Sequence, residues 1–277
     1  MSYVSPKWNN GSAPPLSAEN MQALTDAVQE QGETLATMCN PNMLDNWYFN
    51  NPVNQRGASG TISTAGYFFD RWKLVSGSVT INSGGIVLNG TIAQVLEYAV
   101  GQTVTATVLT PNGVTDVTPV YDDETKTFAV TAQGKIIKAV KLELGSQQTL
   151  AHQDADGNWV LNEIPYYGEQ LRRCQRYYQI IEQYSAYPAA IDVNGNLLAA
   201  IALPVEMRAR PVFSRANLNS NIIDAYFATG GRTGVATVPA IGGTLGFINL
   251  NFQNVPGKTN MGVIARFVDR CFLSADL

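Results

Sequence analysis

Apolar and polar residues alternate with a period of two over most of the chain, in short runs that turn sequences interrupt. One run ends at Ile81, before a Ser83-Gly84-Gly85 turn, and another begins at Ile86 directly after it. Alternation of this kind indicates strands with one buried face, and glycine-containing turns between such runs predict hairpins. Short strands that recur at about ten-residue intervals are typical of a β-sandwich.

Two further groups of strands are predicted downstream. In the first, an alternating run over 104–108 precedes a segment that turn sequences divide at Asp122-Asp123 and at Gln133-Gly134. In the second, the hairpin turn Asn194-Gly195 leads into a strand over 197–203, and alternation returns over 248–252 and 263–269. Pro204 and Pro211 predict an edge or a bend between them, because proline cannot donate to a central ladder.

The pattern changes to a helical period near the N-terminus. Ser17 is a good N-cap residue, and Glu19 lies in the first turn, where the helix dipole favours an acid. The spacing that follows fits a heptad seam, with Gln31 in its one polar position, and the seam consists of Met21, Leu24, Val28, Gln31, Leu35 and Met38. A seam of under three heptads is unstable alone, so we expect this helix to associate with copies of itself. The alternative is an amphipathic helix packed on its own domain.

A second helix is predicted near 168–184, where Leu171, Cys174, Tyr178 and Ile181 form a narrow apolar stripe. We therefore expect a mainly β protein with four parts. Residues 1–41 form an N-terminal attachment arm with a short coiled-coil helix, and residues 42–150 form a jelly-roll-like β-sandwich. Residues 151–183 contain a hairpin and the linking helix, and residues 184–277 form a C-terminal β-sandwich.

Aromatic residues are concentrated between Asn42 and Trp72, interleaved with amides and charged residues. Exposed, they would offer stacking faces and hydrogen-bond groups to a sugar, and the candidates are Trp47, Tyr48, Tyr67 and Trp72. Buried, they would fill the core of the sandwich, as large aromatic side chains usually do. In an alternating strand Trp47 and Tyr48 would face opposite sides, so the four cannot all line one groove. Asp70 and Arg71 fit a structural ion pair or a turn clamp better than a ligand site.

Charge content and the lack of long apolar runs argue against nucleic-acid binding and membrane insertion. Charged residues make up 14% of the 277 residues, which is low, and the net charge is −4. Without a basic stripe we expect no nucleic-acid binding. No run approaches the ~18 apolar residues of a membrane helix, and the first residues lack the apolar segment of a secretory signal. We therefore expect synthesis in the cytoplasm and no membrane insertion.

The sequence carries no recognisable catalytic or metal-binding motif. Cys39, Cys174 and Cys271 are widely spaced and odd in number, so we expect free, buried thiols and no disulfide framework. Asp154, Asp156 and Asn158 resemble the start of a calcium loop, but Pro165 stands where its bidentate Glu should be, and a hairpin turn is the favoured interpretation. We expect no enzyme activity, no cofactor and no metal.

The N-terminal arm contains Trp8 among proline, glycine and asparagine residues that break regular structure. An isolated tryptophan in such a segment needs a surface to bury against, and the arm itself offers little. We therefore expect Trp8 to dock on a partner protein or on a neighbouring subunit.

Several segments together resemble phage and prophage tail-fibre or virion-appendage proteins. The opening PKWNNGSAPPLSAENMQALTDAV is similar to their N-terminal segment, and MLDNWYFNNPVNQRG with GYFFDRW resembles their carbohydrate-binding-module-like jelly-roll domain. EIPYYGEQLRRCQRYYQ resembles the segment that ends that domain, and IALPVEMRARPVF resembles the small sandwich that often follows it. The resemblance covers most of the chain and implies a homotrimeric fibre subunit of a phage particle. It implies no catalytic residues.

We therefore expect a virion protein of a tail fibre, baseplate or head fibre. The resemblance implies that its N-terminus contacts other virion proteins and that its β-domains are candidates for binding a host-surface glycan or receptor. The alternative is a free carbohydrate-binding module or a bacterial surface adhesin. The attachment arm and the short heptad helix favour the virion protein, since an adhesin would need an export signal or an anchor.

Overall fold

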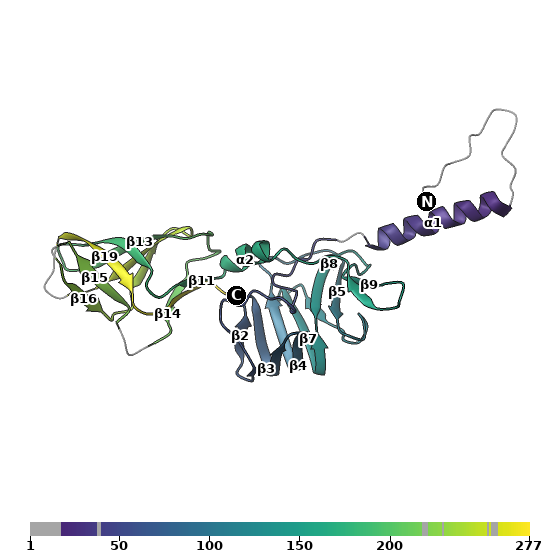
Figure 1. Ribbon diagram of the computed structural model, residues 1–277, viewed down its shortest axis with the longest axis horizontal. Helices are drawn as coiled ribbons and strands as arrows, with labels where there is room; N and C mark the ends of the chain where they lie inside the picture. The colour runs from purple at the N-terminus through teal and green to yellow at the C-terminus, as the bar shows by residue number, and fades with distance from the viewer. Residues whose placement is uncertain (1–17, 38–39, 218–220, 229, 254, 256–259) are drawn as a thin grey trace, which may run out of the picture.

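The computed structural model describes residues 18–37, 40–217, 221–228, 230–253, 255 and 260–277. The chain is mainly β, as the alternating pattern predicts, and the molecule is elongated (Figure 1). A helix extends from one end of a middle body, residues 42–161, and a distal body, residues 178–277, lies at the opposite end of the long axis. A short second helix lies between the two bodies on one side.

The described elements are two helices and twenty strands. The helices are α1 (Ala18–Thr37) and α2 (Tyr167–Gln175). The strands of the middle body are β1 (Thr61–Ile62), β2 (Gly66–Phe69), β3 (Trp72–Asn82), β4 (Gly85–Val95), β5 (Val104–Leu109), β6 (Val120–Asp122), β7 (Thr127–Ile137), β8 (Ala139–Leu144), β9 (Ala151–Gln153) and β10 (Trp159–Leu161). Those of the distal body are β11 (Tyr178–Ile181), β12 (Ala186–Ile191), β13 (Leu197–Ala202), β14 (Val212–Arg215), β15 (Ile223–Phe227), β16 (Arg232–Val235), β17 (Ala240–Gly243), β18 (Phe247–Phe252), β19 (Met261–Phe267) and β20 (Cys271–Ser274).

The middle body is built on an antiparallel sheet with the strand order β1-β3-β4-β7-β6, to which β2 adds by pairing with β3. Strands β5 and β8 form a separate antiparallel pair, and β9 and β10 form a hairpin. Gly77 and Gly90 lie opposite each other in β3 and β4, where a Cβ on Gly90 would stand 2.1 Å from the carbonyl oxygen of Ser76. Only glycine allows this close backbone approach, which also requires positive φ at both positions.

Two strand predictions in the middle body were wrong. The Gln133-Gly134 sequence does not divide two strands, because β7 continues through it with a shift in register against β4. The segment around Trp47 is not a strand of the main sheet. Its backbone hydrogen-bonds to residues 138–142 at Met43, Trp47 and Phe49 and forms one isolated bridge, from Tyr48 to Ala139, while the Asn46 side chain bonds the backbone of Val53.

The helix predicted near 168–184 is shorter than expected. It ends at Gln175, and Tyr178–Ile181 forms β11, which pairs with β20. The apolar stripe is therefore divided: Cys174 is buried on the helix, while Ile181 belongs to the distal core. Three of the four residues in β11 are buried, so tertiary packing decides its conformation over the helical spacing.

The distal body pairs a seven-stranded sheet of order β16-β15-β19-β12-β13-β18-β17 with a three-stranded sheet of order β11-β20-β14. Alternation is regular in β13, where Leu197, Ala199 and Ile201 are buried and the intervening residues are exposed. The predicted turn at Asn194-Gly195 and the bend between Pro204 and Pro211 are both present. Its core is distinct from that of the middle body.

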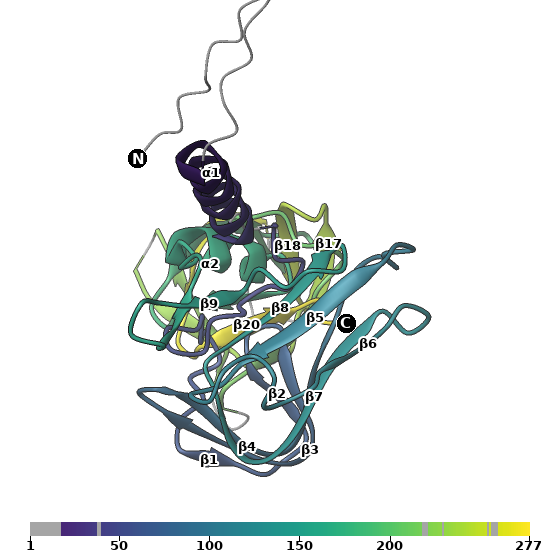
Figure 2. The same ribbon diagram turned by 90° about the vertical axis from the view of Figure 1, so that its right-hand side faces the viewer.

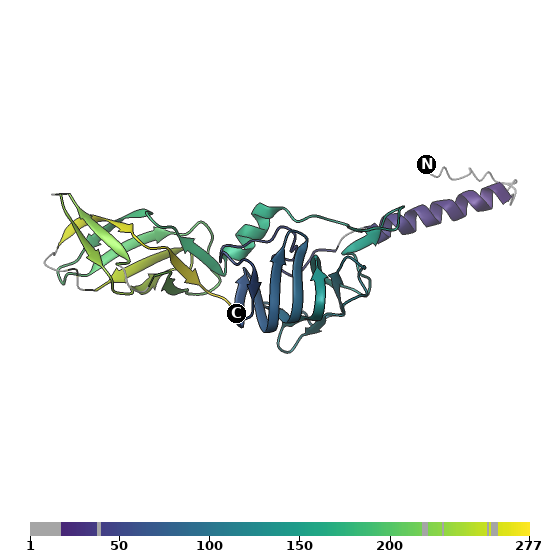
Figure 3. The same ribbon diagram turned by 60° about the horizontal axis from the view of Figure 1, so that its bottom comes forward.

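The segment 151–183 contributes to both cores. Ala151 is buried in the middle core and Trp159 packs against it, whereas Ile181 is buried in the distal core. Helix α2 therefore marks the boundary, with the two bodies on either side of it (Figure 3). Viewed along the long axis, α1 points toward the viewer, and it meets the body of the molecule at β9 (Figure 2).

Candidate functional site

The two tryptophans proposed for sugar stacking are buried. Trp47 is 2% exposed and Trp72 is fully buried. The indole Nε1 of Trp72 donates a hydrogen bond of 2.8 Å to the carbonyl oxygen of Asn46, and the ring meets Phe49 and Phe128 edge-on. A buried ring offers no face to a sugar, so both tryptophans act in the core.

The two tyrosines lie apart from each other and are half-buried. Tyr48 packs beside Trp47, with ring centroids 6.2 Å apart. The Tyr67 hydroxyl donates to the carbonyl oxygen of Leu277, and the guanidinium of Arg56 lies over its ring, 4.8 Å from the centroid. The four aromatic candidates therefore do not form one stacking surface, and Tyr67 belongs to the contact between the two bodies.

One part of that contact, the terminal junction, is formed by Gln55, Arg56, Tyr67, Asp70, Tyr178 and Asp276. Arg56 pairs with the Asp276 carboxylate at 2.6 Å and stacks on the Tyr178 ring at 3.9 Å. Gln55 donates to Asp70 from its backbone and side chain, and to the Tyr178 carbonyl oxygen. Burial raises the pKa of Asp70 to about 6, against the opposing effect of the Gln55 hydrogen bonds.

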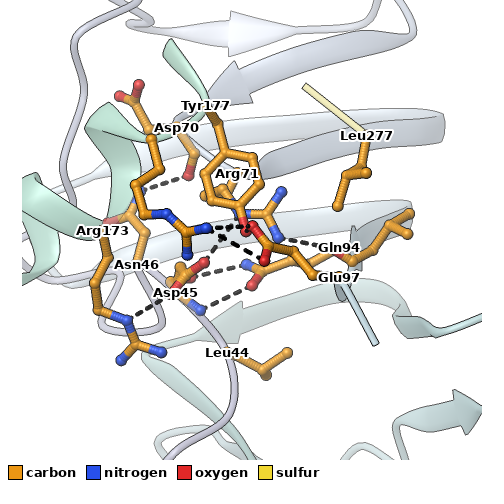
Figure 4. Close-up of polar contacts among 12 residues, drawn as sticks. Leu44, Asp45, Asn46, Asp70, Arg71, Gln94, Glu97, Arg173, Tyr177 and Leu277 are labelled. Carbon is orange, nitrogen blue, oxygen red and sulfur yellow. Dashed lines mark hydrogen bonds and ion pairs between the residues drawn. The ribbon is translucent and has the colours of Figure 1, made fainter. Parts of the chain in front are cut away.

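A second part of the contact is organised around Asp45 and Arg71 (Figure 4). One Asp45 carboxylate oxygen accepts from Arg71 Nε at 3.0 Å, and the other pairs with Arg173 Nε of α2 at 2.7 Å. Arg71 has a φ of 72° in the turn between β2 and β3, a conformation that costs energy for a residue with a side chain. Because Arg71 is also only 2% exposed, surrounding contacts fix its side chain in place.

Glu97 forms the other acidic centre of this region. Its carboxylate accepts from the Tyr177 hydroxyl at 2.7 Å and pairs with Arg176 at 3.2 Å and Arg208 at 3.9 Å. Burial opposes its ionisation, but the Tyr177 hydrogen bond and the two arginines prevail and lower the pKa of Glu97. The Arg71 guanidinium lies over the Tyr177 ring at 3.6 Å from the centroid, a cation–π contact that joins the two acidic centres.

These groups surround a cavity of about 290 Å³, which we call the arginine cavity. It is lined by Met43, Asp45, Arg71, Leu96, Glu97, Tyr98, Ala99, Val100, Arg173, Arg176 and Tyr177. Three arginines and two carboxylates give the lining a formal excess of one positive charge. Charge-assisted hydrogen bonds from arginine suit carboxylate or phosphate oxygens, so the lining can recognise an anion.

The sequence predicts only part of this region. Asp70 and Arg71 are predicted to form an ion pair or a turn clamp, but the two do not pair with each other: Arg71 pairs with Asp45, and Asp70 accepts from Gln55. Asp45 and Glu97 were missed because they are separated from Arg71 in sequence by 26 residues each way. The one available signal was the cluster of arginines in LRRCQRYYQ, on α2 and directly after it.

The structure describes the side chains of three of the six residues in the predicted seam of α1. Met21, Leu24 and Val28 are 49%, 46% and 62% exposed, and their spacing places them on one face of the helix. The side chains of Gln31 and Leu35, together with Met38 and Trp8, lie outside the described residues. Within the described part of the helix, the apolar stripe is thus open to solvent.

The structure also locates the candidate calcium-loop residues and two of the three cysteines. Asp154 accepts from the backbone N–H groups of Asp156 and Asn158 in the turn of the β9–β10 hairpin, which is the favoured interpretation. Among the described residues, no group of three or more His, Cys, Asp or Glu side chains is arranged to hold a metal ion. Cys174 and Cys271 are free and buried, as expected, and Cys39 lies outside the described residues.

Comparison of the chain with protein-family models, curated proteins and solved structures found no match in any of the three. In the part of the chain that the structure describes, no helix is long and apolar enough to cross a membrane.

Proposed function

We propose that this chain is a structural subunit of a phage virion fibre. In this proposal three copies associate through α1 as a short coiled coil, and the N-terminal arm with Trp8 attaches to other virion proteins. The middle body acts as the jelly-roll-like sandwich and the distal body as a second sandwich, both displayed outward.

The observation that carries the proposal is the open apolar stripe of α1. Met21, Leu24 and Val28 are all close to half exposed or more, on a helix that extends away from both bodies (Figure 1). An isolated helix of this length is marginal in water, and packing of an apolar face supplies most helical stability. Identical stripes on neighbouring copies would supply that packing at the end where attachment is proposed.

The junction between the bodies suits display of the distal body at a fixed distance. Arg56 and Asp276 join the two bodies, and Arg71 stacks on Tyr177 at the second contact. A joint with a partly buried ion pair and stacked rings is expected to bend less than a flexible linker would. A host-surface glycan or receptor is the proposed target of the displayed bodies.

Electron microscopy of labelled phage particles tests this proposal. A small epitope tag inserted in the exposed turn at Ala155, between β9 and β10, leaves both strands of the hairpin intact. Gold-labelled antibody is expected on a fibre of intact particles, and particles that carry the untagged chain serve as the control. Label restricted to free protein or to the bacterial surface would contradict the proposal.

A further inference from the structure

We propose that the arginine cavity binds the carboxylate of an acidic sugar, such as a uronic acid unit of a surface polysaccharide. Its biological role rests on the proposed function, whereas the site itself consists of the residues that line the cavity. It differs from the four aromatic residues of the 42–72 stretch, which the structure places in the core and at the terminal junction.

The anion-binding group is Arg71. Its side chain is 2% exposed, with Nε on Asp45 and one terminal nitrogen, Nη2, on the carbonyl oxygen of Val95 at 2.6 Å. The other terminal nitrogen, Nη1, is buried and has no hydrogen-bond partner among the described residues. Arg71 lines the cavity and a buried unsatisfied donor costs about 1–3 kcal/mol, so an acceptor that a ligand places on Nη1 is favoured.

The carboxylates in the wall do not block an anionic ligand. Asp45 already accepts from two arginines, and Glu97 already accepts from Tyr177 and pairs with Arg176. Their charges are therefore compensated, and the lining retains its excess positive charge. Arg173 is 35% exposed on its side chain, so it can reorient toward a ligand oxygen without leaving α2.

The remaining lining favours a sugar over a bare inorganic anion. Tyr98 is 74% exposed and lines the cavity, so its ring is free to pack against the apolar face of a sugar ring. Leu96 and Val100 flank it in sequence and add apolar surface to the same wall. Ligand sites commonly combine an apolar wall with a few placed polar groups, as this cavity does.

The size of the cavity limits the ligand. Its volume of about 290 Å³ lies at the low end of the range of about 300–1,000 Å³ for small-molecule sites. One sugar ring with its carboxylate would fit, while neighbouring units of a polysaccharide would extend into solvent past Tyr98. The inference therefore concerns a single acidic unit.

Ligand-observed NMR on the full purified chain tests the assignment, with D-glucuronate as the acidic probe. D-Glucose, acetate and inorganic phosphate are the matched comparisons. Glucuronate is expected to bind at least about tenfold more tightly than glucose, because it adds a charge-assisted hydrogen bond to Arg71. It is also expected to bind more tightly than acetate and phosphate, because the Tyr98 ring adds a contact that neither anion can make.

Two exposed tyrosines provide matched variants that should leave the fold intact. Tyr98→Ala is expected to weaken glucuronate binding severalfold and to leave acetate unaffected. Tyr166→Ala, at an 82% exposed residue outside the cavity lining, is expected to change neither. Arg173→Gln, at a partly exposed position, should weaken glucuronate more than glucose.

Absence of any glucuronate binding would overturn the assignment. So would glucose, phosphate or acetate binding as tightly as glucuronate, or an equal loss of glucuronate affinity in Tyr98→Ala and Tyr166→Ala. These results are independent of where the protein lies in a particle. Glucuronate binding by a protein that labels no particle would contradict the proposed function and leave the site standing.

Discussion

The 42–72 stretch and helix α1 place the same kinds of side chain in opposite environments. In the stretch, Trp47, Phe49 and Trp72 are at most 2% exposed and pack on one another and on the sheet. In α1, Met21, Leu24 and Val28 are 46–62% exposed although their spacing forms a stripe as regular as any in the chain. The large aromatic side chains of the 42–72 stretch are buried by their own chain, whereas the described apolar stripe of α1 is exposed to solvent.

The buried apolar residues stabilise the fold of one chain, whereas the exposed stripe of α1 is the proposed contact between copies of the chain. Substitutions in the buried stretch should lower the stability of a single chain, because the contacts they remove are internal. Substitutions in the α1 stripe should leave the bodies intact and change only what the helix binds.

The largest effect is expected from Trp72→Ala. The variant removes a fully buried ring, together with its hydrogen bond to Asn46 and its contacts with Phe49 and Phe128. The free energy of unfolding is expected to fall by about 3–5 kcal/mol in urea titrations followed by circular dichroism. Tyr166→Ala is the control, and a loss below about 1 kcal/mol in Trp72→Ala would contradict a core role for this stretch.

The next effect concerns pH. Burial raises the pKa of Asp70 from 3.8 to about 6, so the folded protein holds this proton more tightly than the unfolded chain. The stabilising contribution is full below pH 3.8 and is lost as the pH rises to about 6. Between pH 4 and pH 7, wild type is expected to lose about 2 kcal/mol relative to Asp70→Asn, measured as free energy of unfolding. A wild-type-minus-variant difference that is constant with pH would refute the shifted pKa.

A smaller effect is expected at the terminal junction from Asp276→Ala. The variant leaves Arg56 without its 2.6 Å carboxylate partner, although the guanidinium keeps its stacking on Tyr178. A loss of about 1–3 kcal/mol is expected in the distal body, with the middle body unchanged. Hydrogen exchange of β11 and β20 against β3 and β4 measures both. Equal protection in variant and wild type would show that the ion pair does not hold the distal body.

The smallest effect on stability is expected from Leu24→Glu in α1. Because this side chain has few contacts within its own chain, the free energy of unfolding of the β bodies should stay within about 0.5 kcal/mol of wild type. Urea titration of the two proteins at low concentration measures the difference. A loss of several kcal/mol would mean that α1 packs on its own chain, as an amphipathic helix without partners would.

Much of the fold was predictable, because period-two alternation and glycine turns are local signals. Strands β3, β4, β13 and β18 appear where alternation predicts them, and α1 spans the residues that the heptad spacing indicates. The second helix was overextended, because the spacing of Tyr178 and Ile181 fits a helix as well as the buried strand β11. Short apolar runs do not distinguish the two, and only pairing with β20 decides.

The candidate site was hardly predictable, because its residues meet only through tertiary structure. Asp45 precedes β1, Glu97 follows β4, and Arg173 lies on α2, more than a hundred residues from Asp45. No local pattern connects them. The aromatic stretch predicts a ligand site, yet its largest rings are in the core. The cavity is lined instead by Tyr98, an exposed residue in the loop after β4.

Helix α1 is expected to bury its apolar stripe only when copies of the chain associate through it, and the mass of the purified protein in solution measures that association. Size-exclusion chromatography with light scattering is expected to give three times the 30.0 kDa chain mass for wild type, and the mass of one chain for Leu24→Glu. A wild-type mass of one chain, maintained at high concentration, would show that the copies do not associate through α1.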